Sequence, residues 1–144
     1  GIAVHLHLAK QLPEVRVDPV QLQQVILNSI RNALEAMEET PRERARVDVY
    51  TAQEASGQVS IRVVDTGPGL SEDVLKRVFD PFFTTKFGQG GSGLGLYLAY
   101  SLVTGTLGGQ LQLETGEGLG STCIITLPNQ APAEQDQNND LHRH

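Results

Sequence analysis

Residues 24–37 read QVILNSIRNALEAM, a stretch that combines a helical apolar stripe with two asparagines one turn apart. Just upstream, Asp18 and Pro19 suit a capping residue and a first helical residue, and Gln21 stands where a capping box would close. We therefore predict a helix from residue 19 to about residue 39. Its inward face is predicted to consist of Leu22, Val25, Ile26, Ile30, Ala33, Leu34 and Met37.

The two asparagines, Asn28 and Asn32, are expected near the side of this helix opposite the centre of the apolar stripe. Asparagine is unfavourable inside a helix because its amide competes for backbone hydrogen bonds. Taken alone, the pair fits two tolerated surface residues. It also fits two amide oxygens that point into a site, where Mg²⁺ accepts such ligands together with phosphate oxygens and water.

The rest of the chain is predicted to form strands and two further helices around this first helix. The expected strands are residues 2–8, with Val15 to Val17 as a short partner, then 46–52 and 58–64 as a hairpin around Ser56-Gly57, and finally 109–115 and 121–127. The expected helices are a short one capped by Ser71 that runs through Val78, and one from about Leu94 to Thr104. We therefore predict an α/β two-layer sandwich, with a mixed, mostly antiparallel sheet and about three helices.

Composition narrows the functional classes. The chain has 144 residues, of which 39% are hydrophobic, so we expect one folded domain over residues 1–128 and a disordered polar tail over 129–144. A net charge of -6 argues against binding to nucleic-acid phosphates or anionic membranes. The single Cys123 excludes an intramolecular disulfide, and no apolar run approaches a membrane span. A cytoplasmic location is expected.

A second motif follows the strand predicted at residues 58–64: Asp65-Thr66-Gly67-Pro68-Gly69. Asp and Gly at this place are ordinary turn residues. An Asp fixed at a strand end can also accept a hydrogen bond from an exocyclic amine. Gly67 and Gly69 would then let the backbone approach a flat ring without Cβ clashes.

A third motif, GGSGLGL at residues 90–96, opens the last predicted helix. Glycines before a helix expose unpaired N–H groups that bind phosphate readily, although a flexible hinge would look similar. The motif is not a P-loop, because no Lys-Ser or Lys-Thr follows the glycines. All four phenylalanines lie within residues 78–87, which end near Lys86. Lys86 could reach a triphosphate or be a solvated loop charge.

Together these motifs resemble the ATP-binding catalytic domain of sensor histidine kinases, in the Bergerat (GHKL) ATPase superfamily. The resemblance covers about residues 2–128. Its asparagine, first glycine, phenylalanine and second glycine boxes and its closing segment match residues 24–37, 65–69, 79–86, 91–96 and 118–128. The details of the asparagine and phenylalanine boxes resemble the branch that contains nitrogen-regulation sensor kinases.

The resemblance implies a protein-histidine kinase that binds ATP and Mg²⁺. Asn32 would coordinate Mg²⁺ with help from Asn28, and Lys86 would close over the nucleotide; these three are the implied catalytic residues. Asp65 would bind the adenine amino group, with Thr122 nearby through a water. The full set of implied nucleotide-binding residues is Asn28, Asn32, Asp65, Gly67, Gly69, Lys86, Ser92, Gly93, Leu94, Gly95, Leu96 and Thr122.

Two departures from related families refine the expected chemistry. Gyrase-like ATPases carry a glutamate at the position of Asn28, and since an amide is a poor general base, transfer is favoured over hydrolysis. Many histidine kinases carry Lys or Arg three residues after the second asparagine, where this chain has Glu35. Lys86 and Arg31 are the candidates for the missing basic contact.

The implied acceptor is a histidine on a separate dimerisation domain, with a response regulator downstream. His5 and His7 lie on a predicted strand and His142 and His144 in the tail, so none is expected to accept phosphate. Without its acceptor domain the chain is expected to be inactive. Two alternatives remain: a serine kinase of the same superfamily, disfavoured by the phenylalanine box, and a degenerate regulatory domain.

Overall fold

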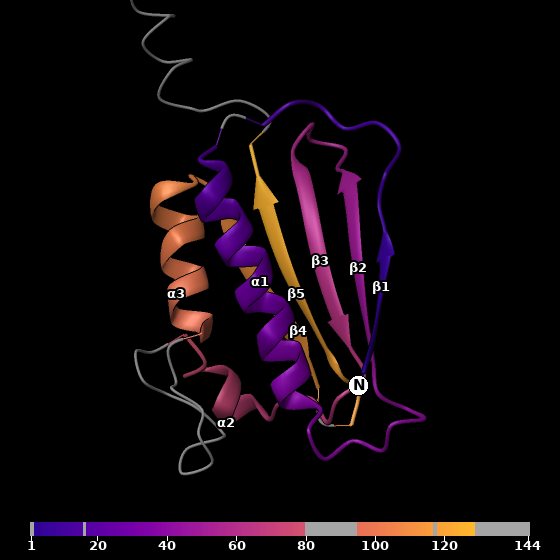
Figure 1. Ribbon diagram of the computed structural model, residues 1–144. Helices are drawn as coiled ribbons and strands as arrows, with labels where there is room; N and C mark the ends of the chain where they lie inside the picture. The colour runs from indigo at the N-terminus through magenta and orange to yellow at the C-terminus, as the bar shows by residue number, and fades with distance from the viewer. Residues whose placement is uncertain (1, 16, 80–94, 117, 129–144) are drawn as a thin grey trace, which may run out of the picture.

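The fold is a single five-stranded sheet with helices packed on one face (Figure 1). The computed structural model describes residues 2–15, 17–79, 95–116 and 118–128. The strands are β1 (Ala3–His7), β2 (Arg46–Gln53), β3 (Val59–Asp65), β4 (Gln110–Thr115) and β5 (Ser121–Leu127). Their order across the sheet is β1-β2-β3-β5-β4, with β1 parallel to β2 and every other neighbouring pair antiparallel.

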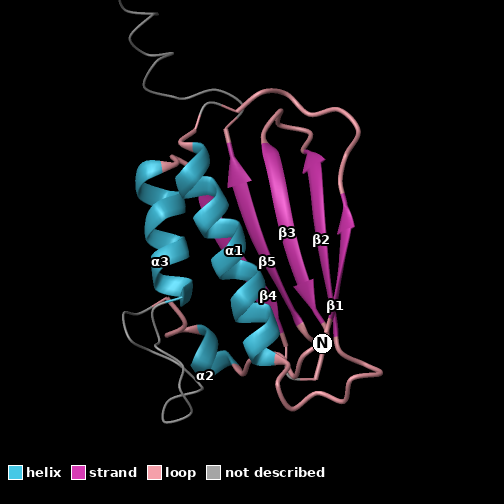
Figure 2. Ribbon diagram, viewed as in Figure 1, coloured by secondary structure: helices cyan, strands magenta, loops and turns pink. Residues whose placement is uncertain are grey.

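The helical layer completes the two-layer sandwich (Figure 2). Its elements are α1 (Pro19–Ala36), α2 (Glu72–Leu75) and α3 (Gly95–Ser101), which continues into the π-helical η1 (Leu102–Thr106). Apolar side chains of α1, α3 and η1 meet those of β2 to β5 in one core. The predicted fold class is confirmed. None of the helices in the described part of the chain is long and apolar enough to span a membrane.

Helix α1 begins as the sequence predicts and ends earlier. The Asp18 side chain accepts hydrogen bonds from the backbone N–H groups of Val20 and Gln21, at 2.9 and 3.3 Å. The expected capping box does not close, because the Gln21 Oε1 atom has no partner among the described residues. The helix ends at Ala36 with Met37 as its C-cap. It stops short of residue 39 because the next backbone N–H groups bond to carbonyls only three residues back.

The predicted N-terminal strand forms, but it is not half-buried. All five residues of β1 are exposed, including Val4 at 40% and Leu6 at 62%. β1 is the edge of the sheet, and within the sheet α1 packs mainly against β3 and β2 rather than against β1 (Figure 1). Val15 and Val17 do not form the predicted partner strand; they pack against the core instead.

The other helix predictions are correct in place and wrong in length. Ser71 caps α2 as expected and accepts a hydrogen bond from the Val74 N–H at 3.3 Å. Turns replace the helix after the C-cap Lys76, where the N–H groups of Arg77 and Val78 bond to carbonyls only three residues back. The last helix changes from α to π geometry at Leu102. The predicted loop over residues 80–93 and the tail over 129–144 lie outside the described residues.

Candidate functional site

The site begins on α1, where Val25, Ser29 and Ala33 form a buried row at a spacing of four that the C-cap residue Met37 continues. Asn28 and Asn32 each precede a member of this row and are half-buried. They therefore flank the buried row, which corrects the prediction that they lie opposite it. The Asn32 Nδ2 atom is buried and has no hydrogen-bond partner among the described residues. A buried amide without a partner is costly, so this side chain is suited to meet a ligand.

Asp65 is the last residue of β3 and is only 7% exposed. Its Oδ1 atom accepts the Gly67 N–H at 2.9 Å, and the Ser121 N–H also bonds to the carboxyl group. Burial raises the pKa of Asp65 above its usual range, and these two backbone bonds only partly oppose that rise. No positive side chain in the described ranges contributes to the shift. The site therefore holds an oriented, buried acceptor whose charge is not neutralised.

Glycines allow the chain to pack tightly around this carboxylate. A Cβ atom on Gly67 would lie 3.1 Å from Met37 Cγ and 3.3 Å from the Ala36 carbonyl oxygen. Gly69 has φ of 75°, and its Cβ would lie 2.0 Å from the Gly116 carbonyl oxygen. The two glycines were predicted to make room for a flat ring. That stays a prediction, and the structure adds a packing role, which fixes the Asp65 turn between the end of α1 and the β4–β5 turn.

The register of β5 separates Thr122 from the Asp65 carboxylate. Asp65 pairs with Ser121, and the Cys123 Sγ atom lies 3.9 Å from Ser29 Oγ on α1. Because side chains alternate along a strand, residues 121 and 123 face α1 and Thr122 faces away. Ser121 is thus a candidate site residue that the sequence motifs did not identify. The alternation of β5 around Cys123 would have identified it.

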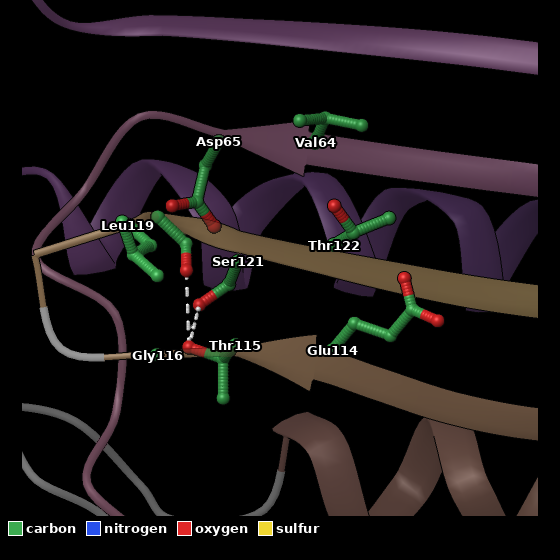
Figure 3. Close-up of a pocket in the computed structure, with 9 residues that line it drawn as sticks. Val64, Asp65, Glu114, Thr115, Gly116, Leu119, Ser121 and Thr122 are labelled. Atoms are coloured by element: carbon green, nitrogen blue, oxygen red, sulfur yellow. Dashed lines mark hydrogen bonds between the residues drawn. The ribbon is translucent and has the colours of Figure 1, made fainter.

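Thr122 lines a pocket of about 290 Å³ where β3, β5 and the β4–β5 turn meet. Figure 3 views this pocket with α1 behind the strands, that is, from the opposite face of the sheet. Val64, Thr122 and Glu114 are register neighbours on that face. Asp65 also contributes to the wall, so the pocket lies around the strand ends where the two faces meet.

The chain after Asp65 leads to the start of α3. Phe79, which follows α2, stacks on Tyr100 of α3, with ring centroids 4.8 Å apart. Figure 1 shows α2 and the start of α3 beside the same half of α1. Of the predicted phosphate-binding residues, Gly95 begins α3 and Leu96 is half-buried on it. Lys86, Ser92, Gly93 and Leu94 lie outside the described residues.

The fold and site define an α/β nucleotide-binding class, and comparison with known proteins narrows it. The family model for histidine kinase-, DNA gyrase B- and HSP90-like ATPases matches residues 17–131, so the chain belongs to that family. This span includes Asn28, Asn32 and Asp65.

The curated relatives are sensor and sporulation kinases. Sporulation kinase E of Bacillus subtilis is 34% identical over 97% of this chain, and the sensor histidine kinase ZraS of Escherichia coli is 40% identical over 81% of it. The matched segment spans only 18% and 23% of those two proteins. The relatives are thus multidomain proteins, of which this domain is the smaller part.

Solved structures give the same result. Full-length ShkA in complex with AMPPNP superposes with a TM-score of 0.73 at 29% identity, covering 89% of this chain and 26% of that one. The catalytic domain of the histidine kinase ThkA superposes with a TM-score of 0.67 at 26% identity, covering 88% and 80%. The fold is that of histidine kinase catalytic domains.

Proposed function

We propose that this chain is the catalytic domain of a two-component sensor histidine kinase. It binds Mg·ATP and transfers the γ-phosphoryl group to a histidine on a separate dimerisation domain. The observation that carries the proposal is the buried Asp65 carboxylate, which is held by two backbone N–H groups and has no cationic partner among the described residues. Such a group has unused lone pairs for an amino group, and adenine presents one.

The asparagines of α1 fit the metal and the phosphates. Asn32 offers a neutral amide oxygen, which Mg²⁺ accepts, and a buried N–H₂ group whose free donors suit a phosphate oxygen. Asn28 lies one turn earlier and joins it. No cluster of three His, Cys, Asp or Glu residues forms a metal site in the described part of the chain, so amide oxygens are the fitting donors. The metal would neutralise charge on the transferred phosphoryl group.

The remaining roles rest on the sequence motifs. Backbone groups around Ser92 to Leu96 bind phosphates, and Lys86 supplies the positive charge that Glu35 does not. At the adenine end, we assign to Ser121 rather than Thr122 the place beside the Asp65 carboxylate, because the Thr122 side chain points to the other face of the sheet.

Transfer is favoured over hydrolysis by the chemistry of α1. Asn28 is an amide and cannot act as a general base toward water. Phosphoryl transfer needs mainly positioning and charge neutralisation; the buried carboxylate and the two amides would supply positioning, and the bound metal would supply neutralisation. The naming of the relatives as sensor histidine kinases supports the same conclusion. The acceptor domain and a response regulator are the partners that this function requires, and the domain would work in the cytoplasm.

The test is an ATP titration with and without Mg²⁺, with phosphate release followed in the same sample. We expect Mg²⁺-dependent binding with almost no release. Labelled phosphate should then pass to a histidine-containing dimerisation domain supplied in trans. Steady release would identify an ATPase and contradict the role given to Asn28. Absence of binding would identify a degenerate regulatory domain.

A further inference from the structure

Glu35 lies on the same side of α1 as the two asparagines. It is three residues after Asn32 and seven after Asn28, and these spacings place side chains along one face of a helix, with Cβ atoms three residues apart separated by about 5–6 Å. All three side chains are half-buried, whereas Arg31 on the next row is exposed. A carboxylate therefore adjoins the surface at which the amides would meet phosphates.

The charge of Glu35 is not balanced within the described structure. Its carboxylate has no hydrogen-bond or ion-pair partner among the described residues, although Arg31 is one turn earlier on the same helix. The Asn32 Nδ2 atom beside it is also unpartnered. The Glu35 carboxylate and the Asn32 amide together favour binding of a divalent cation. They disfavour metal-free ATP, because the carboxylate repels its phosphates and a neutral amide cannot offset that repulsion.

We infer that Glu35 makes the site selective for the metal-bound nucleotide. The inference rests on the proposed function and specifies it: the carboxylate repels metal-free ATP and attracts the cation of Mg·ATP, directly or through a water of its shell. Glu35 is thus a specificity-determining residue for the metal complex. Its role concerns binding, and transfer itself does not depend on it.

The experiment compares ATP affinity in Mg²⁺ and in EDTA by isothermal titration calorimetry, for the native chain, Glu35→Gln and Glu35→Lys. The measured quantity is the dissociation constant in EDTA divided by the dissociation constant in Mg²⁺. This ratio reports the coupling between metal and nucleotide binding. We expect Glu35→Gln to lower this ratio by about tenfold, chiefly by tightening metal-free ATP, and Glu35→Lys to lower it further. The thermal unfolding midpoint of each variant confirms folding.

Glu39→Gln is the matched control, because Glu39 is an exposed acid in the turn just after α1. It removes the same charge from the chain, and it should leave the ratio unchanged within twofold. An unchanged ratio in Glu35→Gln, or an equal fall in Glu39→Gln, would overturn the inference while leaving the proposed function intact. If the native chain binds ATP in neither condition, the proposed function fails and the inference fails with it.

Discussion

Two carboxylates on opposite faces of the same sheet show how differently a buried acid can be used. Asp65 faces α1 at the end of β3 and is 7% exposed. Asp48 lies in β2 between the core residues Val47 and Val49, so it faces the other way, and it is 8% exposed. The two residues have nearly the same exposed fraction, but the groups that pair with their carboxylates differ.

Asp48 is fully paired. Arg46 donates to both of its oxygens, at 2.8 and 2.9 Å, and His7 Nε2 lies 2.7 Å from Oδ1 while its ring stacks on Tyr50. The hydrogen bonds from Arg46, followed by those from His7, hold the pKa of Asp48 below its usual range. Within the part of the chain that the structure describes, Asp65 has backbone donors alone, and burial raises its pKa. The paired acid joins β1 to β2, and the unpaired acid is available to a ligand.

The largest effect should come from the packing that holds Asp65 in place. Gly120 has φ of 75°, and a Cβ there would lie 2.3 Å from the Asp65 carbonyl oxygen. We expect Gly120→Ala to lower the free energy of unfolding by about 3 kcal/mol or more and to abolish nucleotide binding. Urea unfolding measures the first effect and calorimetry the second.

Gly118→Ala is the control for backbone strain alone. Gly118 has φ of 78°, and no atom of the described residues would lie within 4 Å of a Cβ at this position. We expect a loss of about 1 kcal/mol and intact binding. Equal losses in the two variants would mean that the close contact at Asp65 is not what makes Gly120 necessary.

The next effect tests the proposed ligand role of Asp65. Asp65→Asn keeps the shape and one acceptor oxygen but removes the charge and part of the acceptor capacity. We expect ATP affinity to fall by at least about 100-fold, about 2.7 kcal/mol, with the unfolding free energy changed by no more than about 1 kcal/mol. Calorimetry and urea unfolding give the two values. Retained affinity would show that the adenine does not bind at Asp65.

The paired acid should show the opposite pattern. Asp48→Asn leaves Arg46 and His7 without their shared acceptor, and since Arg46 is half-exposed we expect a modest loss of about 1–2 kcal/mol in unfolding free energy. ATP affinity should stay within twofold. A loss of affinity as large as that of Asp65→Asn would contradict the proposal that Asp65 binds the ligand and Asp48 only stabilises the sheet.

The two acids also show how far sequence reasoning reaches. Motif spacing was enough to identify Asp65, because an acid between an apolar strand and a Gly-rich turn is a local pattern. Motif spacing did not identify the pairing of Asp48 with His7, because these residues are 41 apart in sequence and meet only through the parallel pairing of β1 with β2. The motif also did not show that Thr122 faces away from the Asp65 carboxylate, because facing depends on strand register. The helical layer and sheet type followed from periodicity, whereas the exposure of β1 depended on where α1 crosses the sheet.

The smallest effect is a difference in pH dependence. Asp48 has a folded-state pKa below the ordinary 3.8, so its stabilisation is present above that pH and is lost as pH falls through the folded-state value. The difference in unfolding free energy between the native chain and Asp48→Asn should therefore become smaller below about pH 3.8.

Asp65 has a folded-state pKa above 3.8, so its contribution to stability is fully present below that pH and is lost as pH rises through the folded-state value. The unfolding free energy of Asp65→Asn should therefore increase relative to that of the native chain as pH rises from about 3.8 toward neutrality. Urea unfolding of the three proteins at several pH values measures both trends. If the two differences in unfolding free energy change with pH in the same direction, the two carboxylates do not differ in the way that their partners require.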